Sequence, residues 1–320
     1  MKAICCMQFI VITLFFSLFT NGYAAENKLA IALFLWRGET VAEQGFKDGL
    51  RDLGYEVEYT VFNAAQEKGN LAKILHSDVQ FNKYDYVYTF GTTATAMVKQ
   101  ALADAVPHVF NIVADPVGAK IVAAVDATGG NICGVSNDIP LSLQIKKARD
   151  IFAFNRLGVV FNPREKNSEI ISNNLVALGK ELNFEVERIR TAPTREILEQ
   201  TLMKIRDKSI NVDAIYFPTD SFLVSEAEII GRQLKEGKIV SIGAIKKYID
   251  KGVMLGMVTD YYTLGKLAAG IIDKHQNGKK LQEIPVQFQE NPTFVVNATT
   301  ADTLGIHIDE MVLKDAVIVK

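Results

Sequence analysis

The sequence is poor in cysteine, with three in 320 residues. Cys5 and Cys6 lie in an apolar stretch at the N-terminus, so Cys133 alone remains if that stretch is removed. No disulfide can then form within the chain. A protein of this size buries enough apolar surface to fold without one. Cys133 itself lies in a strand-like run, where a small buried side chain is expected.

The sequence also has no excess of positive charge. Lys and Arg together number 35, and Asp and Glu number 37. A phosphate backbone is held by clustered basic residues, so this balance argues against a nucleic-acid partner.

Motifs typical of enzymes and cofactor sites are missing. The sequence contains no Gly-x-Ser-x-Gly, no phosphate loop ending in Gly-Lys-Ser/Thr, and no Gly-x-Gly-x-x-Gly after the first strand. The four histidines are scattered without metal-ligand spacing, and His108 lies in a strand where packing explains it. We therefore expect no enzyme activity, no cofactor and no metal. A hydrolase or transferase that uses cleft carboxylates as acid and base is the weakest alternative.

A long apolar run occurs only at the N-terminus. Lys2 precedes an apolar block over residues 9–19, and Gly22 and Ala24 occupy the positions that signal peptidase reads. This pattern predicts a signal peptide over residues 1–24 and an exported, periplasmic or otherwise extracytoplasmic protein. A retained membrane anchor is the alternative, but a spanning helix needs ~20 apolar residues and this block is shorter. The leader cysteines lack the preceding apolar run that a lipid anchor requires.

After the leader, short apolar strands alternate with helical patterns to the end of the chain. This alternation predicts βαβ units and an α/β fold with mainly parallel sheets. The pattern restarts near residues 134–140, and there are too many strands for one sheet. We therefore expect two doubly wound lobes joined by hinge crossovers without a flexible linker. The expected limits are 25–135 plus about 259–286 for the N-terminal lobe, and 136–258 plus about 287–320 for the C-terminal lobe.

Polar turns follow the predicted strands. Ligands bind parallel α/β sheets beyond the carboxyl ends of the strands, and the turns there are residues 36–40, 91–93, 114–116, 162–163, 218–221 and 259–261. Backbone N–H groups at helix starts favour an anion, whereas Asp115, Asp220 and Asp260 favour a cation. A site with both suits a zwitterion such as an amino acid, and Trp36 or Tyr261 can stack on an apolar part of it.

Each of these turn residues also has a purely structural explanation. Thr92, Thr219 and Ser221 have the side chains of helix caps, which need no ligand. Asp115 followed by proline is a common turn. A tryptophan at a strand end is often a partly buried packing residue.

Several of these turns form an ordered series of motifs. They are Gly45–Leu50 with Leu53–Tyr55, Gly91–Ala94, Ala114–Ala119, Gly129–Ser136, Phe161–Pro163 with Asn167-Ser168, Asp213–Tyr216 with Pro218–Asp220, and Asp260–Tyr262 with Leu264-Gly265. In order and spacing, they resemble the ABC-transporter substrate-binding proteins of the tryptophan/tyrosine-binding type, which have the type I periplasmic-binding-protein fold. The resemblance covers nearly all of the chain after the leader.

This resemblance implies a two-lobed protein that closes on a small molecule and passes it to a membrane permease. It implies that hydroxyl and carboxylate groups at the matching turns hold the ligand: Thr92, Thr93, Asp115, Asn162, Ser168, Thr219, Asp220 and Asp260. To these we add Trp36, Arg37 and Thr40 from the first turn.

Two segments depart from the family pattern. Arg37 and Glu39 bring charge to the first turn, and residues 244–248 read Ala-Ile-Lys-Lys-Tyr where an acidic or glycine-rich segment is common. Arg37 can clamp a carboxylate with two hydrogen bonds, or it can pair with Glu39 in solvent. The ligand's identity therefore stays open between amino acids and related carboxylates.

The leading functional hypothesis is a monomeric solute-binding protein of an ABC importer, with a small zwitterionic or carboxylate-bearing ligand. The alternative is a ligand-binding input protein that docks on a sensory receptor instead of a permease. Both functions use the same closed-lobe surface, so residues alone do not separate them.

Overall fold

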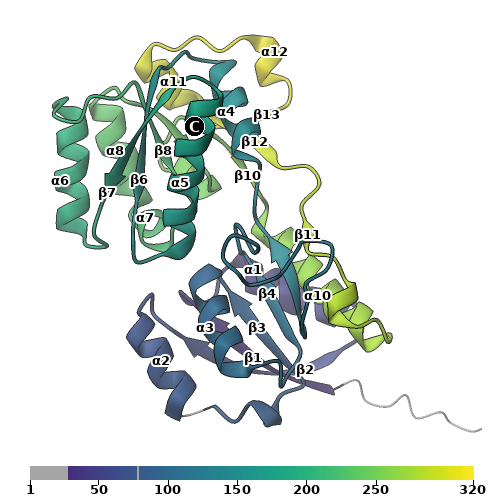
Figure 1. Ribbon diagram of the computed structural model, residues 1–320. Helices are drawn as coiled ribbons and strands as arrows, with labels where there is room; N and C mark the ends of the chain where they lie inside the picture. Colours follow the sequence, from purple (N-terminus) through teal and green to yellow (C-terminus); the bar gives the residue numbers. More distant parts are fainter. Residues whose placement is uncertain (1–27, 78) are drawn as a thin grey trace, which may run out of the picture.

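The computed structural model describes residues 28–77 and 79–320. The chain forms two α/β lobes, one above the other in Figure 1, each built on its own sheet. The predicted signal peptide over residues 1–24 lies outside the described residues. No helix within the described part is both long and apolar enough to cross a membrane.

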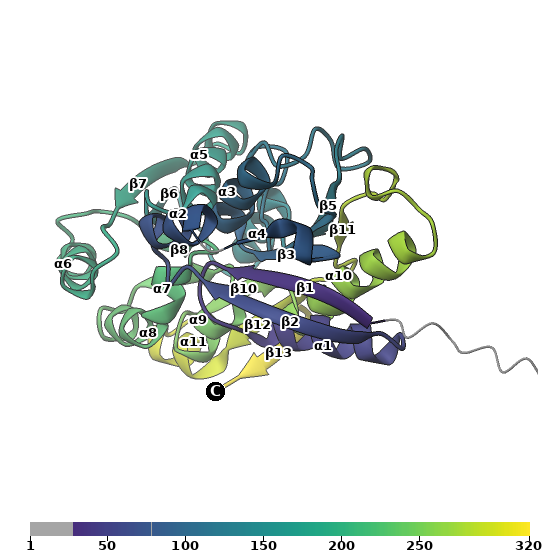
Figure 2. The ribbon, with the colours of Figure 1, turned by 90° about the horizontal axis from the view of Figure 1, so that it is seen from below.

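The first lobe contains a six-stranded parallel sheet in the order β11-β5-β4-β3-β1-β2. Its strands are β1 (Lys28–Leu35), β2 (Glu56–Asn63), β3 (Tyr86–Phe90), β4 (His108–Asn111), β5 (Ile132–Ser136) and β11 (Gln287–Phe288). Its helices are α1 (Val41–Asp52), α2 (Lys68–Ser77), α3 (Thr92–Leu102) and α10 (Tyr261–Gln276), with short 3-10 turns at Phe81–Lys83 and Leu281–Glu283. Helices α2 and α3 lie on one side of β1 and α1 lies on the other (Figure 2).

The second lobe contains a seven-stranded sheet in the order β13-β12-β10-β9-β8-β6-β7, parallel except where β10 meets β12. Its strands are β6 (Arg156–Phe161), β7 (Glu185–Arg190), β8 (Ala214–Phe217), β9 (Val240–Gly243), β10 (Leu255–Val258), β12 (Thr293–Asn297) and β13 (Ala316–Val319). Its helices are α4 (Leu141–Arg149), α5 (Lys166–Glu181), α6 (Arg195–Arg206), α7 (Ser221–Ser225), α8 (Ala227–Glu236), α9 (Lys246–Asp250), α11 (Ala298–Leu304) and α12 (Glu310–Leu313). The predicted α/β architecture of two parallel-sheet lobes is confirmed.

The central strands are apolar throughout because helices cover both faces of the sheet. In β8, Ala214 and Tyr216 pack in the core on the side of α4 and α5. Ile215 and Phe217 pack in a separate core with α6 and α8. The two-residue period of the strand thus distributes one continuous apolar run between two cores.

Helices α1 and α10 cross closely beneath the first sheet, although they are far apart in the sequence. A Cβ at Gly45 would lie 2.1 Å from the carbonyl oxygen of Tyr262, and one at Gly265 would lie 2.1 Å from that of Ala42. The glycines therefore permit a backbone approach that a larger residue would block. This crossing fixes the N-terminal end of α10 beside α1, at the edge of the cleft.

The chain passes between the sheets three times: after β5, after β10 and after β11. Two crossings are tied together, because the Asp260 N–H donates to the Gln289 side-chain oxygen at 2.7 Å. Strand β11 pairs with β5 in the first sheet, two residues past the limit expected near residue 286. The crossings are short ordered segments, in keeping with the absence of a linker in the sequence.

The sequence-based elements differ from the structure mainly in the last third of the chain. The apolar spacing over residues 224–235 predicts one helix, whereas the structure has two, α7 and α8, which meet at Glu226. Helices α9, α11 and α12 and strand β13 were not predicted. These elements have four to seven residues each, so periodicity gives little signal.

Candidate functional site

A small cavity lies between the lobes, where the carboxyl ends of both sheets face each other. Its volume is about 20 Å³, which is enough for about one water molecule. Its lining combines turns after β1, β3 and β4, the first interlobe crossing, and helix starts of the second lobe. The residues are Trp36, Arg37, Phe90, Gly91, Thr92, Thr93, Ile112, Asn137, Glu165, Asn167, Thr219, Asp220, Ser221, Ile245 and Tyr261.

Polar side-chain atoms without partners concentrate in this cavity. Among the described residues, nine buried side-chain nitrogen or oxygen atoms lack a hydrogen-bond partner, and seven belong to residues that line it. They are Trp36 Nε1, Arg37 Nε, Thr92 Oγ1, Thr93 Oγ1, Asn137 Oδ1, Thr219 Oγ1 and Asp220 Oδ2. Burying a polar atom without a partner costs free energy, so such atoms are rare in folded proteins. Their convergence is what a polar ligand site requires.

The first lobe supplies mainly donors. The indole N–H of Trp36 and the Nε–H of Arg37 point into buried space without acceptors. Beside them, the N-cap residue of α3 is Gly91, which has no side chain to cap the helix, and Thr92 and Thr93 add their hydroxyls. A helix start with uncapped N–H groups, next to a guanidinium group, favours an anion such as a carboxylate.

Arg37 lies at the cleft and does not pair with Glu39. Its guanidinium lies 5.3 Å from the centre of the Phe90 ring. Glu39 is exposed and pairs instead with Lys47 at 2.7 Å. Of the two explanations that the sequence left open for Arg37, the structure excludes the ion pair with Glu39 and places the guanidinium at the small cavity.

The second lobe supplies acceptors, led by the buried carboxylates of Glu165 and Asp220. Glu165 is 3% exposed and accepts the Ser221 N–H with both oxygens at 3.0 Å. Asp220 is 2% exposed; one oxygen accepts the Leu223 N–H at 2.8 Å and caps α7, and the other has no partner. Two adjacent buried carboxylates with a vacant acceptor favour an ammonium group.

Burial raises the pKa of both carboxyl groups. Burial is the main cause that raises the pKa of Asp220 well above its usual value, and the charge of Glu165 raises it further. Burial also raises the pKa of Glu165, although the Ser221 N–H, the nearby Trp36 indole and the charge of Arg37 each lower it. The indole N–H approaches Glu165 without reaching hydrogen-bond geometry. The two groups therefore hold protons at pH values where free carboxylates are ionised, and a cation beside them would stabilise their ionised forms.

The floor of the cavity in the first lobe rests on a buried hydrogen-bond chain. Thr40 caps α1, and its N–H donates to Oε2 of the fully buried Glu43 at 2.7 Å. The other oxygen of Glu43 accepts from Tyr88 Oη at 2.8 Å. Asn111 donates to the same Tyr88 oxygen at 3.1 Å. Next to it, Ile112 has a φ of 56°, which is costly for a β-branched residue. This hydrogen-bond chain holds the turns after β1 and β4 together beneath the small cavity.

The predicted site residues divide into three groups in the structure. Six line the small cavity: Trp36, Arg37, Thr92, Thr93, Thr219 and Asp220. Asp115 lines a neighbouring cavity, and Thr40 and Asp260 line an open groove. Asn162 and Ser168 are buried behind the site, where the Asn162 side chain accepts the Arg164 N–H and Ser168 Oγ accepts the Asn162 N–H.

Four polar residues of the cavity were not among the predicted ligand contacts: Asn137, Glu165, Asn167 and Ser221. Glu165 stands in the run Arg164-Glu165-Lys166, which in sequence looks like a solvated loop. Only its place directly before α5, at a turn already identified, was a signal. Asn137 lies in the first interlobe crossing, within the segment that the sequence indicated as the boundary between the lobes.

An apolar groove adjoins the small cavity. Its volume is about 760 Å³, and it shares Arg37, Ser221, Ile245 and Tyr261 with the cavity. Valines from both lobes line it: Val41, Val224, Val258, Val295 and Val317. A ligand with a zwitterionic head thus finds apolar surface directly beside the polar cavity.

Comparison with known proteins identifies the family of this chain. Residues 29–320 match the family described as ABC transporter substrate binding protein. A tyrosine-binding protein from Clostridioides difficile is 26% identical over 269 residues, which are 83% of this chain and 76% of that protein. A conserved domain protein from Vibrio cholerae has a similar structure, with a TM-score of 0.82, 26% identity, and coverage of 91% of this chain and 99% of the other.

A third relative was crystallised with a ligand. It is an ABC domain from Streptococcus pneumoniae in complex with L-Trp, with a TM-score of 0.81, 24% identity, and coverage of 91% of this chain and 100% of that one. The family match over almost all described residues and the shared architecture agree with the resemblance that the sequence motifs indicated. The chain belongs to the ABC transporter substrate-binding proteins and has the type I periplasmic-binding-protein fold.

Proposed function

We propose that this protein captures one α-amino acid between its two lobes and delivers it to the permease of an ABC importer. The carrying observation is the set of seven unpartnered polar atoms around one interlobe cavity. Donors come from the first lobe and carboxylates from the second. A zwitterion satisfies both sets at once.

The proposed orientation follows from charge. The α-carboxylate lies against the start of α3, Arg37 and the Trp36 indole, where N–H groups are available. The α-ammonium lies against Glu165 and Asp220. Charge-assisted hydrogen bonds are the strong ones, so this head group supplies affinity whatever the side chain.

The side chain of the amino acid is proposed to be large and apolar. The relative from C. difficile is named a tyrosine-binding protein, and the structure from S. pneumoniae contains L-Trp. In this chain, the valine-lined groove beside the cavity offers apolar surface for such a side chain. Tyrosine and tryptophan are accordingly the first ligands to test.

Binding is proposed to require opening and closing of the lobes. The cavity holds about one water molecule, so an amino acid enters only when the lobes separate. We propose that they move as units about the three crossings, residues 28–135 with about 259–288 as one unit and residues 136–258 with about 289–320 as the other. A ligand that contacts both lobes favours the closed state by its differential affinity.

Export completes the proposal. The leader pattern over residues 1–24 supports secretion to the periplasm or another extracytoplasmic compartment. There, the closed protein is proposed to act as a monomer that docks on a membrane permease, in line with its family.

The chain carries its own reporter for the test, because Trp36 is its single tryptophan. Titration of the chain without residues 1–24 with tyrosine should change Trp36 fluorescence, excited where tyrosine does not absorb. Because tryptophan itself fluoresces, its binding should be measured by calorimetry. A ligand at 100 times its Kd should also stabilise the protein by ~2.7 kcal/mol. If no amino acid of a full panel changes fluorescence or thermal stability, the proposal is wrong.

A further inference from the structure

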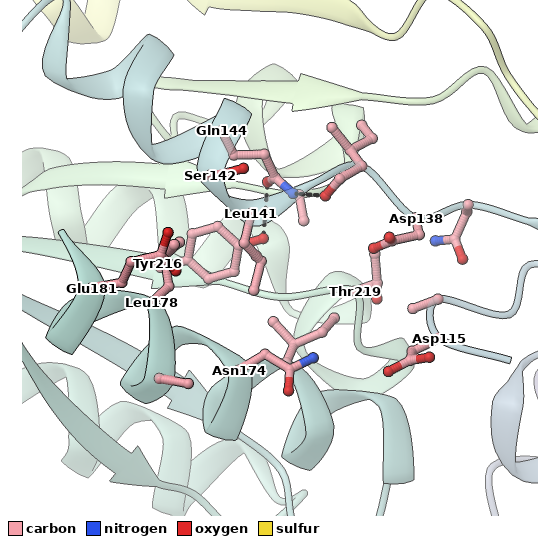
Figure 3. Close-up of a pocket in the computed structure, with 16 residues that line it drawn as sticks. Asp115, Asp138, Leu141, Ser142, Gln144, Asn174, Leu178, Glu181, Tyr216 and Thr219 are labelled. Atoms are coloured by element: carbon pink, nitrogen blue, oxygen red, sulfur yellow. Dashed lines mark hydrogen bonds between the residues drawn. The ribbon is translucent and has the colours of Figure 1, made fainter. Parts of the chain in front are cut away.

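A second, larger cavity lies on the other side of Asn137 and Thr219, the two residues that it shares with the amino-acid cavity. Its volume is about 420 Å³, within the range of small-molecule sites. In Figure 3, Asp115 and Asp138 lie at one end with Thr219 between them, and Tyr216, Leu178 and Glu181 lie at the other. The proposed amino-acid site leaves this cavity without a function.

The lining of this cavity is acidic. Asp115, Asp138 and Glu181 contribute carboxylates, and none of the described lining residues is basic. Asp138 is exposed at the cavity mouth, yet the surrounding protein, and then the charge of Asp115, raise its pKa to about 6. Two neighbouring carboxylates at one end of a cavity gain from a cation between them.

The lining suits an organic cation better than a metal ion. Within the described residues, no group of three His, Cys, Asp or Glu side chains is arranged to hold a metal. The acids are instead spread along a cavity that also has apolar walls, from Ile139, Leu141, Ile171 and Leu178. This spacing suits a molecule with charged ends and an aliphatic middle.

Unpartnered neutral oxygens support the same conclusion. Asn137 is 5% exposed, lines the cavity, and its Oδ1 accepts no hydrogen bond. Thr219 Oγ1 is also without a partner. At the other end, the Tyr216 ring lines the cavity, held by its hydroxyl, which donates to Gln144 Oε1 at 2.9 Å. Carbonyl oxygens and aromatic rings are groups that attract ammonium and guanidinium ions.

The cavity joins the two lobes. Ala114 and Asp115 follow β4 of the first lobe, residues 137–139 form the first crossing, and the helical lining comes from α4 and α5 of the second lobe. Asp115 Oδ1 is occupied by the Gly118 N–H at 2.7 Å, which orients the side chain. A molecule that contacts Asp115 and α5 together therefore connects the lobes.

We propose that this cavity is a second binding site, for a small aliphatic ammonium or guanidinium compound, held by Asp115, Asp138 and Tyr216, and that it adjoins the amino-acid cavity through the shared residues Asn137 and Thr219. Its occupant favours the closed arrangement of the lobes because it contacts both. The proposal does not depend on the identity of the amino acid, because the cation needs no carboxylate.

The test uses agmatine, which has a guanidinium and an ammonium group but no carboxylate, and butylurea as an uncharged compound of similar shape. Calorimetry should show one agmatine bound per chain and no binding of butylurea. Asp138→Asn and Asp115→Asn should each weaken agmatine binding about tenfold or more, the usual effect of losing a hydrogen bond to a charged group. Asp138 accepts no side-chain hydrogen bond from the described residues, so its variant should fold as the parent does.

Two matched controls decide between sites. Asp150→Asn removes an exposed carboxylate at the end of α4, outside the cavity, and should change agmatine affinity about twofold or less. Asp220→Asn alters the amino-acid cavity, and it should also change agmatine affinity by about twofold or less. The proposal is overturned if butylurea binds as well as agmatine, if agmatine does not bind, or if Asp220→Asn abolishes binding that Asp138→Asn leaves intact.

Discussion

Glu165 accepts the N–H of Ser221, the residue that follows Asp220, so one helical turn holds two buried carboxylates together. They come from different segments, the turn after β6 and the turn after β8. Across the cavity stand Arg37 and the start of α3. Amino-acid capture, in our proposal, rests on this opposition of two acids on one lobe and donors on the other.

Neutralising either acid should weaken amino-acid binding without unfolding the protein. Asp220→Asn keeps the shape and the cap of α7, since asparagine is also a good N-cap. Glu165→Gln keeps an acceptor for Ser221. Each should lower affinity by about tenfold to a hundredfold, the usual contribution of a charged hydrogen bond. The melting temperature of the free protein should stay or rise, because a buried charge is removed. Calorimetry and thermal unfolding measure the two effects.

Asp260→Asn is the matched control for these variants. The sequence motifs predicted that Asp260 contacts the ligand, but in the structure its carboxylate is exposed and accepts the Tyr262 N–H at 3.1 Å and the Thr263 hydroxyl at 2.6 Å. We expect a change of about twofold or less in affinity. A large loss here with intact binding by the Asp220 variant would contradict the proposed site.

Amino-acid affinity should rise with pH. In the free protein burial raises the pKa of both Glu165 and Asp220, so the pair holds protons at pH values where free carboxylates are ionised. An incoming ammonium requires the ionised form and displaces protons. Affinity therefore increases as pH rises toward the raised values and levels off above them. Titrations from about pH 4 to about pH 8, where an amino acid stays a zwitterion, measure this; proton release appears in calorimetry in buffers of different ionisation enthalpy.

The stability of the free protein should change in the opposite direction. A carboxyl group whose pKa is higher in the folded than in the unfolded state stabilises the fold below its unfolded value, and this stabilisation is lost as pH rises through the folded value. Free protein should thus lose this contribution on going from acidic to neutral pH, whereas the saturated complex keeps more of it. The ligand-induced shift in melting temperature should grow with pH. A shift that stays constant or shrinks would contradict the protonated pair.

The fold was largely predictable from the sequence, because βαβ alternation and turn residues are local signals. The apolar runs over residues 132–136, 156–161 and 293–297 predict strands, and the spacing over 195–206 predicts a helix; these are the limits of β5, β6, β12 and α6. Trp36, Thr92 and Asp220 were expected at the cleft because they follow strands. Glu165 was missed because its neighbours Arg164 and Lys166 suggest a solvated loop. Its burial depends on contact with Ser221, 56 residues away, and no local pattern encodes that contact.

Thr92→Val should separate ligand binding from stability. The Thr92 hydroxyl is buried without a partner, so its replacement by an isosteric methyl group should leave the free energy of unfolding unchanged or increase it. Amino-acid affinity should fall, because the α-carboxylate loses a donor. Thr95→Val on the same helix is the control: its hydroxyl lies 2.8 Å from Thr89 Oγ1 and 2.9 Å from the Gly91 oxygen, so that variant should lose about 1 kcal/mol of stability. Equal stability losses in both would show that the Thr92 hydroxyl has a partner in solution.

Gly45→Ala should destabilise the protein strongly, because α1 and α10 touch at this residue. The new Cβ would lie 2.1 Å from the Tyr262 carbonyl oxygen, and a backbone oxygen cannot turn aside as a side chain does. We expect a loss of about 3 kcal/mol or more in the free energy of unfolding, the upper end of the cost of overpacking. Denaturant unfolding of Gly45→Ala, and of the control variant in the next paragraph, measures this loss.

Gly270→Ala is the control on α10, since a Cβ there meets no atom within 4 Å. Alanine is a better helix former than glycine, so this variant should gain about 0.5–1 kcal/mol. Opposite signs would show that the close approach, and not helix propensity, explains the glycine at residue 45. Because α10 starts at Tyr261, which lines the amino-acid cavity, Gly45→Ala should also weaken ligand binding, whereas Gly270→Ala should leave it unchanged. If Gly45→Ala is as stable as the parent, the crossing of α1 and α10 differs from the one described.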